Sequence, residues 1–365
     1  MPRYVDTPGM LPVFARLTRS RAIASGIDGH QYDTVTGGLA RLRDWPARFL
    51  ATGRAHRARA EEAAADGRRR SAGQAFQHAA RWCHFATVLP HPDRETAAAA
   101  AAEAEECWHA ALGHLDPDAA VLVQEDPETG FRGVLRRPRP RPRPGARAGE
   151  EAGAAGVVVL VPGMDSTAVE FHTMADELLV RGVAVLAIDG PGQGRLAATT
   201  VLQPEYHRVV AGALDALKEH DGLDLERVGV LALSLGGFYG ALSAARDPRI
   251  RAAVTVSGPS TLEWDALAPY VVETLVQRAG GRAAARRFAR AVDVTGFAAG
   301  IDCPLRVVDG GGDVIPGVAN GAPLAHLAPE GEYLLVPDGD HLVQNARWAW
   351  LPDTADWLVG RLAAV

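Results

Sequence analysis

A single serine stands where an apolar run meets a pair of glycines. The run at 228–233 ends at Ser234, and Gly236 and Gly237 follow within the stretch VLALSLGGFYG. A serine hydroxyl attacks a carbonyl only when a base takes its proton, and it must project clear of the sheet. A sharp strand-to-helix turn exposes it, and this turn needs small residues two places before and after the serine. Those residues are Ala232 and Gly236, so the stretch predicts a nucleophile elbow with alanine at its first small position; the alternative is a serine that only caps a helix.

A general base and a residue that orients it are expected downstream, each just past a strand. The run at 305–308 leads into DGGGDVIP, which contains Asp313, and the run at 333–336 leads into PDGDHLVQN, which contains His341. The chain order of serine, acid and histidine fits a hydrolytic triad. We prefer Asp313 as the acid because it follows glycines that let the loop turn. Three rival acids lie nearby in the sequence: Asp309, Asp338 and Asp340.

Two backbone amides are candidates to hold a developing oxyanion. Leu235 directly follows the candidate nucleophile and begins the next helix. Met164 lies in the loop PGMDST after an early apolar run, where Gly163 lets the backbone approach closely. The same loop could also be an ordinary turn whose helix is capped by Asp165 or Ser166, and this reading is compatible with the first.

Two other chemistries find little support in the sequence. The segment IDGPGQGRL superficially resembles a dinucleotide-binding loop, but its glycines have the wrong spacing and no helix begins directly after them. The twelve histidines are scattered, without the spacing and company of a zinc site. We therefore expect neither a cofactor nor a metal.

The candidate residues need a sheet to carry them, and the second half of the chain predicts one. Short apolar runs alternate with helices, which is typical of a parallel sheet covered on both faces. The runs fall at 157–161, 183–188, 228–233, 252–256, 305–308 and 333–336. Helices are expected near 167–180, 205–218, 238–245 and 318–327, with a last helix at the end of the chain. We predict a doubly wound α/β fold with a helical insertion at about 258–298, preceded by two strands at 119–124 and 131–135.

The N-terminal part predicts helices without strands. Residues 38–115 are rich in Ala, Arg and Glu, with a break at Asp66-Gly67 and an expected N-cap at Ser71. We expect an N-terminal helical cap domain over residues 1–115.

The remaining residues, 116–365, are expected to form the catalytic domain. We expect residues 137–155 to form a flexible loop, and its alternating Arg and Pro predict that it is exposed, because such a segment stays extended and solvated. A basic docking segment for an acidic partner is the alternative.

Composition narrows the class of partner. The 365 residues carry a formal net charge of -6, whereas nucleic-acid binding usually needs a basic surface. Three widely spaced cysteines suggest no disulfide framework, and no segment has the apolar length of a signal peptide or a membrane span. We expect a cytoplasmic protein that binds a small-molecule substrate and neither nucleic acid nor a membrane. An exposed aromatic face on the helical part would suit a homodimer, and it would equally suit a roof over a substrate pocket.

With these residues in view, the chain resembles the α/β-hydrolase superfamily, in the branch with an N-terminal helical domain that includes 2,6-dihydroxypseudooxynicotine hydrolase and the FrsA-type esterases. The superfamily features appear as VPGMDST, DGPGQG, ALSLGG, GGGD and DGDH, and the branch features as PGMDST and the run DWPARF to RWCHFA. Relatives tend to carry Lys-Glu where this chain has Ala168-Val169. The resemblance implies a hydrolase that uses Ser234, Asp313 and His341, with the helical domain roofing the pocket.

Several side chains are candidates to line that pocket. A carbon leaving group would need extra polar groups, which the segment STLEWDALAPY could supply, and aromatic side chains would suit a flat or acyl-chain substrate. The candidates are Trp82, His84, Phe85, Met164, Phe238, Tyr239, Glu263, Trp264, Asp265 and Tyr270. An ordinary core or surface position is an equally acceptable interpretation for each.

Three functions compete. The first is a serine hydrolase that cleaves an ester, thioester or activated C–C bond of a small metabolite, in secondary metabolism for instance, through an acyl-enzyme. The second is a non-hydrolytic biosynthetic enzyme, an epimerase, cyclase or lyase, with the same pocket. The third is a binding protein that kept the fold and lost catalysis.

Overall fold

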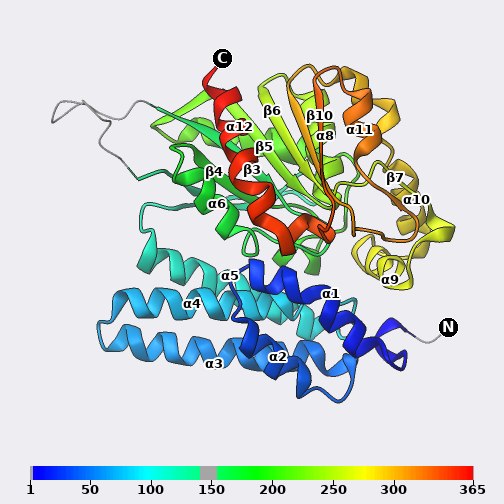
Figure 1. Ribbon diagram of the computed structural model, residues 1–365. Helices are drawn as coiled ribbons and strands as arrows, with labels where there is room; N and C mark the ends of the chain where they lie inside the picture. Colours follow the sequence, from blue (N-terminus) through cyan, green and yellow to red (C-terminus); the bar gives the residue numbers. More distant parts are fainter. Residues whose placement is uncertain (1–2, 140–153, 365) are drawn as a thin grey trace.

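The computed structural model describes residues 3–139 and 154–364 (Figure 1). Most of the Arg-Pro segment predicted within 137–155 lies outside these residues. Among the described residues, no helix combines the length and the apolar character needed to cross a membrane.

An eight-stranded sheet forms the centre of the C-terminal part. Its strand order is β1-β2-β4-β3-β5-β6-β8-β10, with antiparallel pairing of β1 with β2 and of β2 with β4, and parallel pairing elsewhere. The strands are β1 Ala120–Gln124, β2 Phe131–Arg136, β3 Ala155–Val161, β4 Ala184–Asp189, β5 Leu223–Leu233, β6 Ile250–Val256, β8 Leu305–Gly310 and β10 Gly331–Val336. The apolar runs therefore form the predicted, mostly parallel sheet, and the doubly wound fold is confirmed.

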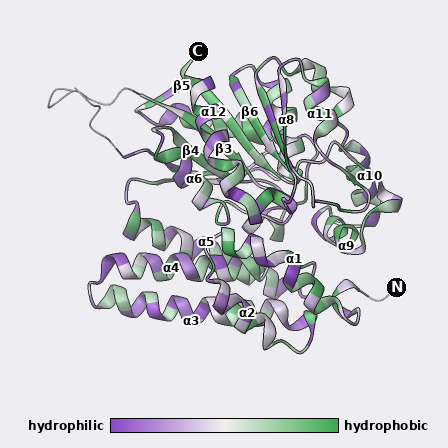
Figure 2. Cartoon of the chain, in the orientation of Figure 1, coloured by the Kyte–Doolittle hydropathy of each residue, from purple (hydrophilic) through white to green (hydrophobic). Residues whose placement is uncertain are grey.

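Helices cover both faces of this sheet, because the central strands are apolar on both sides. Helices α6 (His172–Leu179) and α12 (Leu351–Ala363) share one buried cluster with the strands. Helices α7 (His207–Ala216), α8 (Leu235–Arg246) and α11 (Ala322–Leu327) pack in another. Figure 2 shows the strands as the most continuously hydrophobic part of the molecule.

A helical segment lies between β6 and β8, where the sequence predicts an insertion at about 258–298. It contains α9 (Pro269–Arg278), α10 (Arg282–Ala291) and a short strand, β7 (Thr261–Leu262). The helix expected near 318–327 is divided: residues Val318–Ala319 form β9, which pairs with β7, and α11 begins only at Ala322. Similarly, the helix expected near 167–180 is shorter, since a turn occupies 168–171 before α6.

Five α-helices make up most of the described N-terminal part, and Figure 1 shows them together on one side of the sheet. They are α1 Met10–Ala24, α2 Gly29–Gly37, α3 Trp45–Ala65, α4 Arg69–Phe85 and α5 Arg94–Leu115. The predicted break at Asp66-Gly67 is present, with Gly67 in a left-handed conformation at φ +73. The N-cap expected at Ser71 is wrong, because α4 already begins at Arg69. The sequence also did not predict α1 and α2.

The N-terminal helices have an aromatic core of their own. Trp45 stacks on Phe49 with ring centroids 4.0 Å apart, and Tyr32, Trp82 and Phe85 are buried in the same cluster. Helix α1 contacts the 3-10 segment η8 (His341–Ala349), and α5 contacts the 3-10 segment η3 (Gly194–Ala198). Because η8 follows β10 and η3 follows β4, the helices cover the carboxyl ends of the parallel strands.

Candidate active site

The turn at the end of β5 holds Ser234 in a strained conformation. Ser234 has φ 54° and ψ -129°, which a side-chain-bearing residue rarely adopts. Its N–H donates to the Val256 carbonyl at 2.8 Å, and the Gly237 N–H donates to its carbonyl at 2.7 Å. A Cβ at Gly236 would collide with the backbone of Val161 and Pro162. The glycine is therefore required where the helix passes close to β3.

Ala232, at the first small position of this turn, lies next to Gly240 on α8. A Cβ placed at Gly240 would lie 2.5 Å from the Cβ of Ala232. The methyl of Ala232 thus occupies space that Gly240 leaves free on α8.

A chain of two hydrogen bonds joins Ser234, His341 and Asp313. The His341 Nε2 atom lies 3.0 Å from Ser234 Oγ, and its Nδ1 atom lies 2.8 Å from Asp313 Oδ2. When the Nδ1–H donates to the carboxylate, Nε2 is left to accept the serine proton. The structure brings these three residues together; their catalytic role stays a prediction.

The electrostatics of this chain favour an ionised acid beside a basic imidazole. Burial alone would lower the pKa of His341, but the charge and hydrogen bond of Asp313 raise it above its ordinary value. Burial would raise the pKa of Asp313, yet His341 and a hydrogen bond from Ser257 bring it below its ordinary value. Ser257 is itself held at φ 50°, and its Oγ accepts the Leu342 N–H at 2.9 Å. Ser257 therefore ties the acid to the histidine loop, a contact that the sequence did not reveal.

Two of the three rival acids have other partners, and the third lies on the surface. Asp309 is buried, and its Oδ2 accepts the Gly321 N–H at 2.8 Å; burial raises its pKa to about 6. Asp338 is exposed. Asp340 accepts a hydrogen bond from the Ser20 hydroxyl and also caps η8. Of these acids, Asp313 alone is hydrogen-bonded to the His341 ring among the described residues.

A cavity of about 280 Å³ opens beside Ser234 and His341. Both candidate oxyanion residues, Met164 and Leu235, line it. One wall comes from the insertion and the loops after β8, with the apolar side chains Leu262, Val271, Leu275, Ile315 and Val318. The facing wall comes from α1, with Phe14, Leu17, Thr18 and Arg21. A largely apolar cavity with a few polar groups is typical of a small-molecule site.

Arg21 links α1 to the loop that carries Met164. Its guanidinium donates to both carboxylate oxygens of Glu170, at 2.6 and 2.7 Å, and to Asp165 at 3.2 Å. The His84 Nε2 atom lies 2.9 Å from the same Glu170 carboxylate. Burial would raise the pKa of Glu170, but Arg21 and His84 lower it to about 2. The carboxylate is therefore ionised and held from two helices of the N-terminal part.

The same helix also holds the histidine loop. Ser20, the residue before Arg21, donates its hydroxyl hydrogen bond to Asp340, the neighbour of His341. Arg347, later in η8, donates to the carbonyl of Ala24 at the end of α1. Helix α1 thus contacts both loops that flank Ser234. Ser20, Arg21 and Glu170 were not predicted from the sequence, although the position of Glu170 just after the PGMDST loop was a usable signal.

Of the predicted pocket residues, Met164 and Tyr270 line the cavity and the others do not. Trp82 and Phe85 are buried in the aromatic core of the N-terminal helices, where large side chains on several faces of α4 are needed to fill space. His84 is buried at the interface, between Glu170 and the Thr167 hydroxyl at 3.1 Å.

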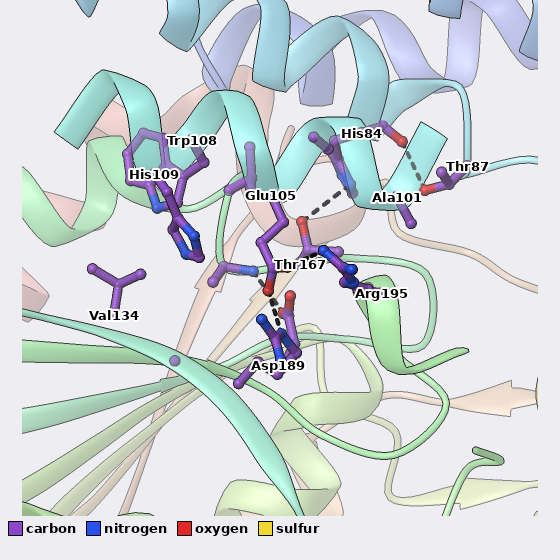
Figure 3. A pocket seen from close by; sticks show the side chains of 16 residues that line it. His84, Thr87, Ala101, Glu105, Trp108, His109, Val134, Thr167, Asp189 and Arg195 are labelled. Atoms are coloured by element: carbon purple, nitrogen blue, oxygen red, sulfur yellow. Dashed lines mark hydrogen bonds and ion pairs between the residues drawn. The ribbon is translucent and has the colours of Figure 1, made fainter. Parts of the chain in front are cut away.

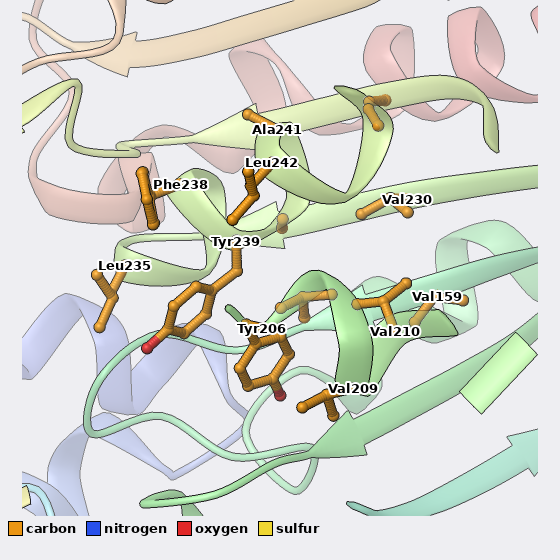
Figure 4. Close-up of a cluster of buried hydrophobic side chains, with 14 of the residues drawn as sticks. Val159, Tyr206, Val209, Val210, Val230, Leu235, Phe238, Tyr239, Ala241 and Leu242 are labelled. Carbon is orange, nitrogen blue, oxygen red and sulfur yellow. The ribbon is translucent and has the colours of Figure 1, made fainter. Parts of the chain in front are cut away.

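The candidates on α8 and in the insertion also lie elsewhere. Phe238 and Tyr239 point into the core beneath the elbow, where Tyr239 stacks on Tyr206 with ring centroids 4.2 Å apart (Figure 4). Trp264 is buried in the same cluster. Glu263 and Asp265 are exposed, and Asp265 pairs with Arg286 on α10. Phe238 and Tyr239 lie outside the cavity because they are on the side of α8 that packs in the core, whereas Glu263 and Asp265 are exposed on the insertion.

A second, smaller pocket lies between the N-terminal helices and the sheet, and Figure 3 shows its lining. Asp189, at the end of β4, accepts the Ala168 N–H at 2.8 Å, and burial raises its pKa to about 7. Glu105 pairs with Arg132 and Arg195 in the same pocket. No cluster of metal-binding side chains is found among residues 3–139 and 154–364.

Comparison with known proteins identifies relatives for the whole chain. Residues 152–296 match a family described as serine aminopeptidase, S33. The 2,6-dihydropseudooxynicotine hydrolase of Paenarthrobacter nicotinovorans is 28% identical over 349 residues, which cover 93% of this chain and 90% of the relative. The crystal structure of a 2,6-dihydroxy-pseudo-oxynicotine hydrolase superimposes with a TM-score of 0.82 at 25% identity, covering 94% of this chain and 96% of that one.

Two further similarities are more limited. The 20-hydroxy-prefusarin hydrolase FUS2 of Gibberella moniliformis is 34% identical over 214 residues, covering 56% of this chain and 49% of the relative. The structure of AbyA5 superimposes with a TM-score of 0.69 at 19% identity, covering 97% of this chain and 98% of that one, and shows likeness of fold. The N-terminal helices are part of both whole-chain structural matches.

Proposed function

We propose that this chain, which belongs to the α/β-hydrolase superfamily, is a serine hydrolase that cleaves an ester, thioester or activated C–C bond of a small metabolite through an acyl-enzyme. One observation carries the proposal. The hydrogen-bonded chain from Asp313 through His341 to Ser234 ends at a largely apolar cavity. The hydrolase relatives, among them the fungal 20-hydroxy-prefusarin hydrolase, support hydrolysis of a secondary metabolite.

Acylation begins when His341 Nε2 takes the Ser234 proton. The Oγ lone pair forms a bond to the substrate carbonyl carbon, and the C=O electron pair moves onto oxygen. The N–H groups of Leu235 and Met164 stabilise this oxyanion, and the Asp313 carboxylate stabilises the imidazolium.

The tetrahedral intermediate then collapses. The bond to the leaving group breaks with its electron pair, and the His341 imidazolium delivers the proton to that leaving group. Water next loses a proton to His341 and attacks the acyl carbon, and Ser234 recovers its proton as the acid leaves. When the leaving atom is carbon, an adjacent carbonyl must stabilise the developing negative charge. A β-diketone meets this requirement, because its leaving group is an enolate. Esters and thioesters do not need an adjacent carbonyl, because the electron pair leaves on oxygen or sulfur.

Covalent labelling tests the proposal. The protein is treated with a fluorophosphonate, and the intact mass is compared for wild type, Ser234→Ala and the control Ser243→Ala. Ser243 is a buried serine on the same helix, hydrogen-bonded to the Tyr239 carbonyl at 2.7 Å. We expect one adduct in wild type and in Ser243→Ala and none in Ser234→Ala. An adduct that persists in Ser234→Ala would contradict the assignment of the nucleophile.

Product mass separates hydrolysis from isomerisation. Hydrolysis adds one water and divides the substrate between two products, whereas an epimerase or cyclase leaves the mass unchanged. We expect two products whose masses sum to the mass of the substrate plus water. A single product with the mass of the substrate would contradict hydrolysis and favour an epimerase or cyclase.

A further inference from the structure

A further cavity of about 130 Å³, next to the pocket in Figure 3, lies at the boundary between the N-terminal helices and the insertion. Its lining comes from the start of α5, from η3 and from the end of α9, and it shares Thr87, Ala101 and Gly194 with the pocket in Figure 3. Most of its other lining residues are alanines, so side chains leave its centre open. The charged residues that line it are Arg94 and Arg278.

Within the described part of the chain, both guanidiniums donate hydrogen bonds only to neutral oxygens. Arg278 donates to the carbonyls of Gly192 at 3.1 Å and Thr87 at 3.3 Å. Arg94 donates to the carbonyl of Gln277 at 3.0 Å. Among the described residues, neither arginine forms an ion pair. Two positive charges therefore share one partly enclosed space without a counter-ion.

Nearby carboxylates are engaged elsewhere. Asp165 pairs with Arg21, and Asp189 accepts the Ala168 amide. Burial lowers the pKa of Arg278, and the charge of Arg94 acts in the same direction, whereas Asp165 and Asp189 act oppositely without cancelling the shift. A neighbouring arginine at the same interface does have an acidic partner: Arg195 pairs with Glu105 at 3.1 Å. Among the described residues, the lack of an acidic partner is therefore a feature of this cavity and not of the whole interface.

We propose that this cavity binds a small oxyanion, a carboxylate or a phosphate group, between Arg94 and Arg278. Arginine presents several N–H donors in one plane, a geometry that matches the oxygens of carboxylate and phosphate. Bringing an anion into the cavity supplies the missing counter-charge to both guanidiniums, and the side-chain amide of Gln277 offers a further donor.

The oxyanion can be a free anion or one end of the substrate. Helix α9 lines both cavities: Val271 and Leu275 face the cavity at Ser234, and Arg278 lies one turn further along the same helix face. An acyl substrate long enough to extend along α9 from Ser234 would bring an anionic end toward Arg278. This second possibility rests on the proposed function, whereas binding of the anion itself does not.

Inorganic phosphate is the probe for the site. The melting temperature of wild type, Arg94→Gln, Arg278→Gln and the control Arg195→Gln is measured against phosphate concentration, with chloride keeping ionic strength constant. We expect a saturable rise for wild type and Arg195→Gln. For each of the other two variants the apparent phosphate affinity falls by about tenfold or more, as loss of a charged hydrogen-bonding partner predicts. Arg94 is exposed, so its variant stays informative if Arg278→Gln folds poorly.

No saturable rise in the melting temperature of wild type, or an equal rise in all four proteins, would overturn the proposal.

A second experiment, with esters, then identifies the source of the anion. Two p-nitrophenyl esters of equal chain length are compared, one ending in a carboxylate and one in a methyl group. A fall in kcat/KM of Arg278→Gln for the carboxylate ester alone assigns the site to substrate. Unchanged ester selectivity, with phosphate binding lost, assigns it to a free anion. Failure of wild type to turn over either ester, with phosphate binding intact, would count against the hydrolase mechanism and leave the anion site standing.

Discussion

The Arg21 guanidinium and the Glu170 carboxylate form a two-bond ion pair, 2.6 and 2.7 Å long, across the boundary between α1 and the loop that carries Met164. Glu170 is buried, and His84 contacts it from α4. The position of a candidate oxyanion donor therefore depends on helices from the other end of the chain. Removing the N-terminal contacts should affect catalysis as well as substrate binding.

Arg21→Lys should lower kcat by about tenfold or more on any turned-over ester, because lysine cannot make the forked contact and small displacements at a reacting centre are costly. KM should change less than kcat if the loop positions the oxyanion donor. The matched control is Arg19→Lys on the same helix, whose exposed pair with Asp33 should leave both constants near wild type. Equal kinetics for the two variants would contradict a positioning role for Arg21.

Replacing Arg21 should lower the free energy of unfolding more than replacing Arg19. Arg21→Met leaves the buried Glu170 carboxylate without its main partner, and we expect it to reduce the free energy of unfolding by about 3–5 kcal/mol. Arg19→Met removes an exposed pair and should cost about 0–1 kcal/mol. Urea unfolding of both variants measures the difference, and a similar midpoint for the two would argue against an ion pair held in a low-dielectric interface.

The pKa of His341 should set the pH at which kcat/KM falls on the acid side of its pH profile. Because Asp313 raises the pKa of His341 above its ordinary value of 6.5, the ring is protonated, and unable to accept the serine proton, below that raised pKa. We expect kcat/KM to fall as pH falls, with an apparent pKa above 6.5. Asp313→Asn removes the charge, so any residual activity should have its acid limb at lower pH, with kcat reduced by about 10³-fold or more. A wild-type limb below 6.5 would contradict this coupling.

The contact between Ala232 and Gly240 predicts a stability effect at the elbow. In Gly240→Ala the new methyl would lie 2.5 Å from the Ala232 Cβ, and we expect destabilisation by about 1–3 kcal/mol from overpacking. Gly113→Ala on α5 is the control, because its methyl meets nothing within 4 Å and should stabilise the helix by about 0.5–1 kcal/mol. The double variant Ala232→Gly/Gly240→Ala should recover much of the lost stability. Additive losses would show that the two methyls do not compete for space.

The hydrogen-bonded residues were predictable because each follows an apolar strand, and parallel strands bring their carboxyl ends to one edge. Ser234, Asp313 and His341 could therefore be placed from local patterns alone. The pocket lining could not, because aromatic side chains such as Trp82 and Tyr239 satisfy a helical core as well as they would a pocket. Contacts such as Arg21 with Glu170 join residues far apart in the sequence, and no local periodicity encodes them.

Trapping the acyl-enzyme tests whether Ser234 is the nucleophile. A p-nitrophenyl ester is mixed with the protein, and the reaction is stopped with acid before the steady state. The masses of the intact protein and of its peptides are then measured by mass spectrometry. We predict the acyl mass on the peptide that contains Ser234 in wild type and no acyl mass in Ser234→Ala. Turnover of the ester by Ser234→Ala at the wild-type rate, or an acyl group on another residue, would contradict it.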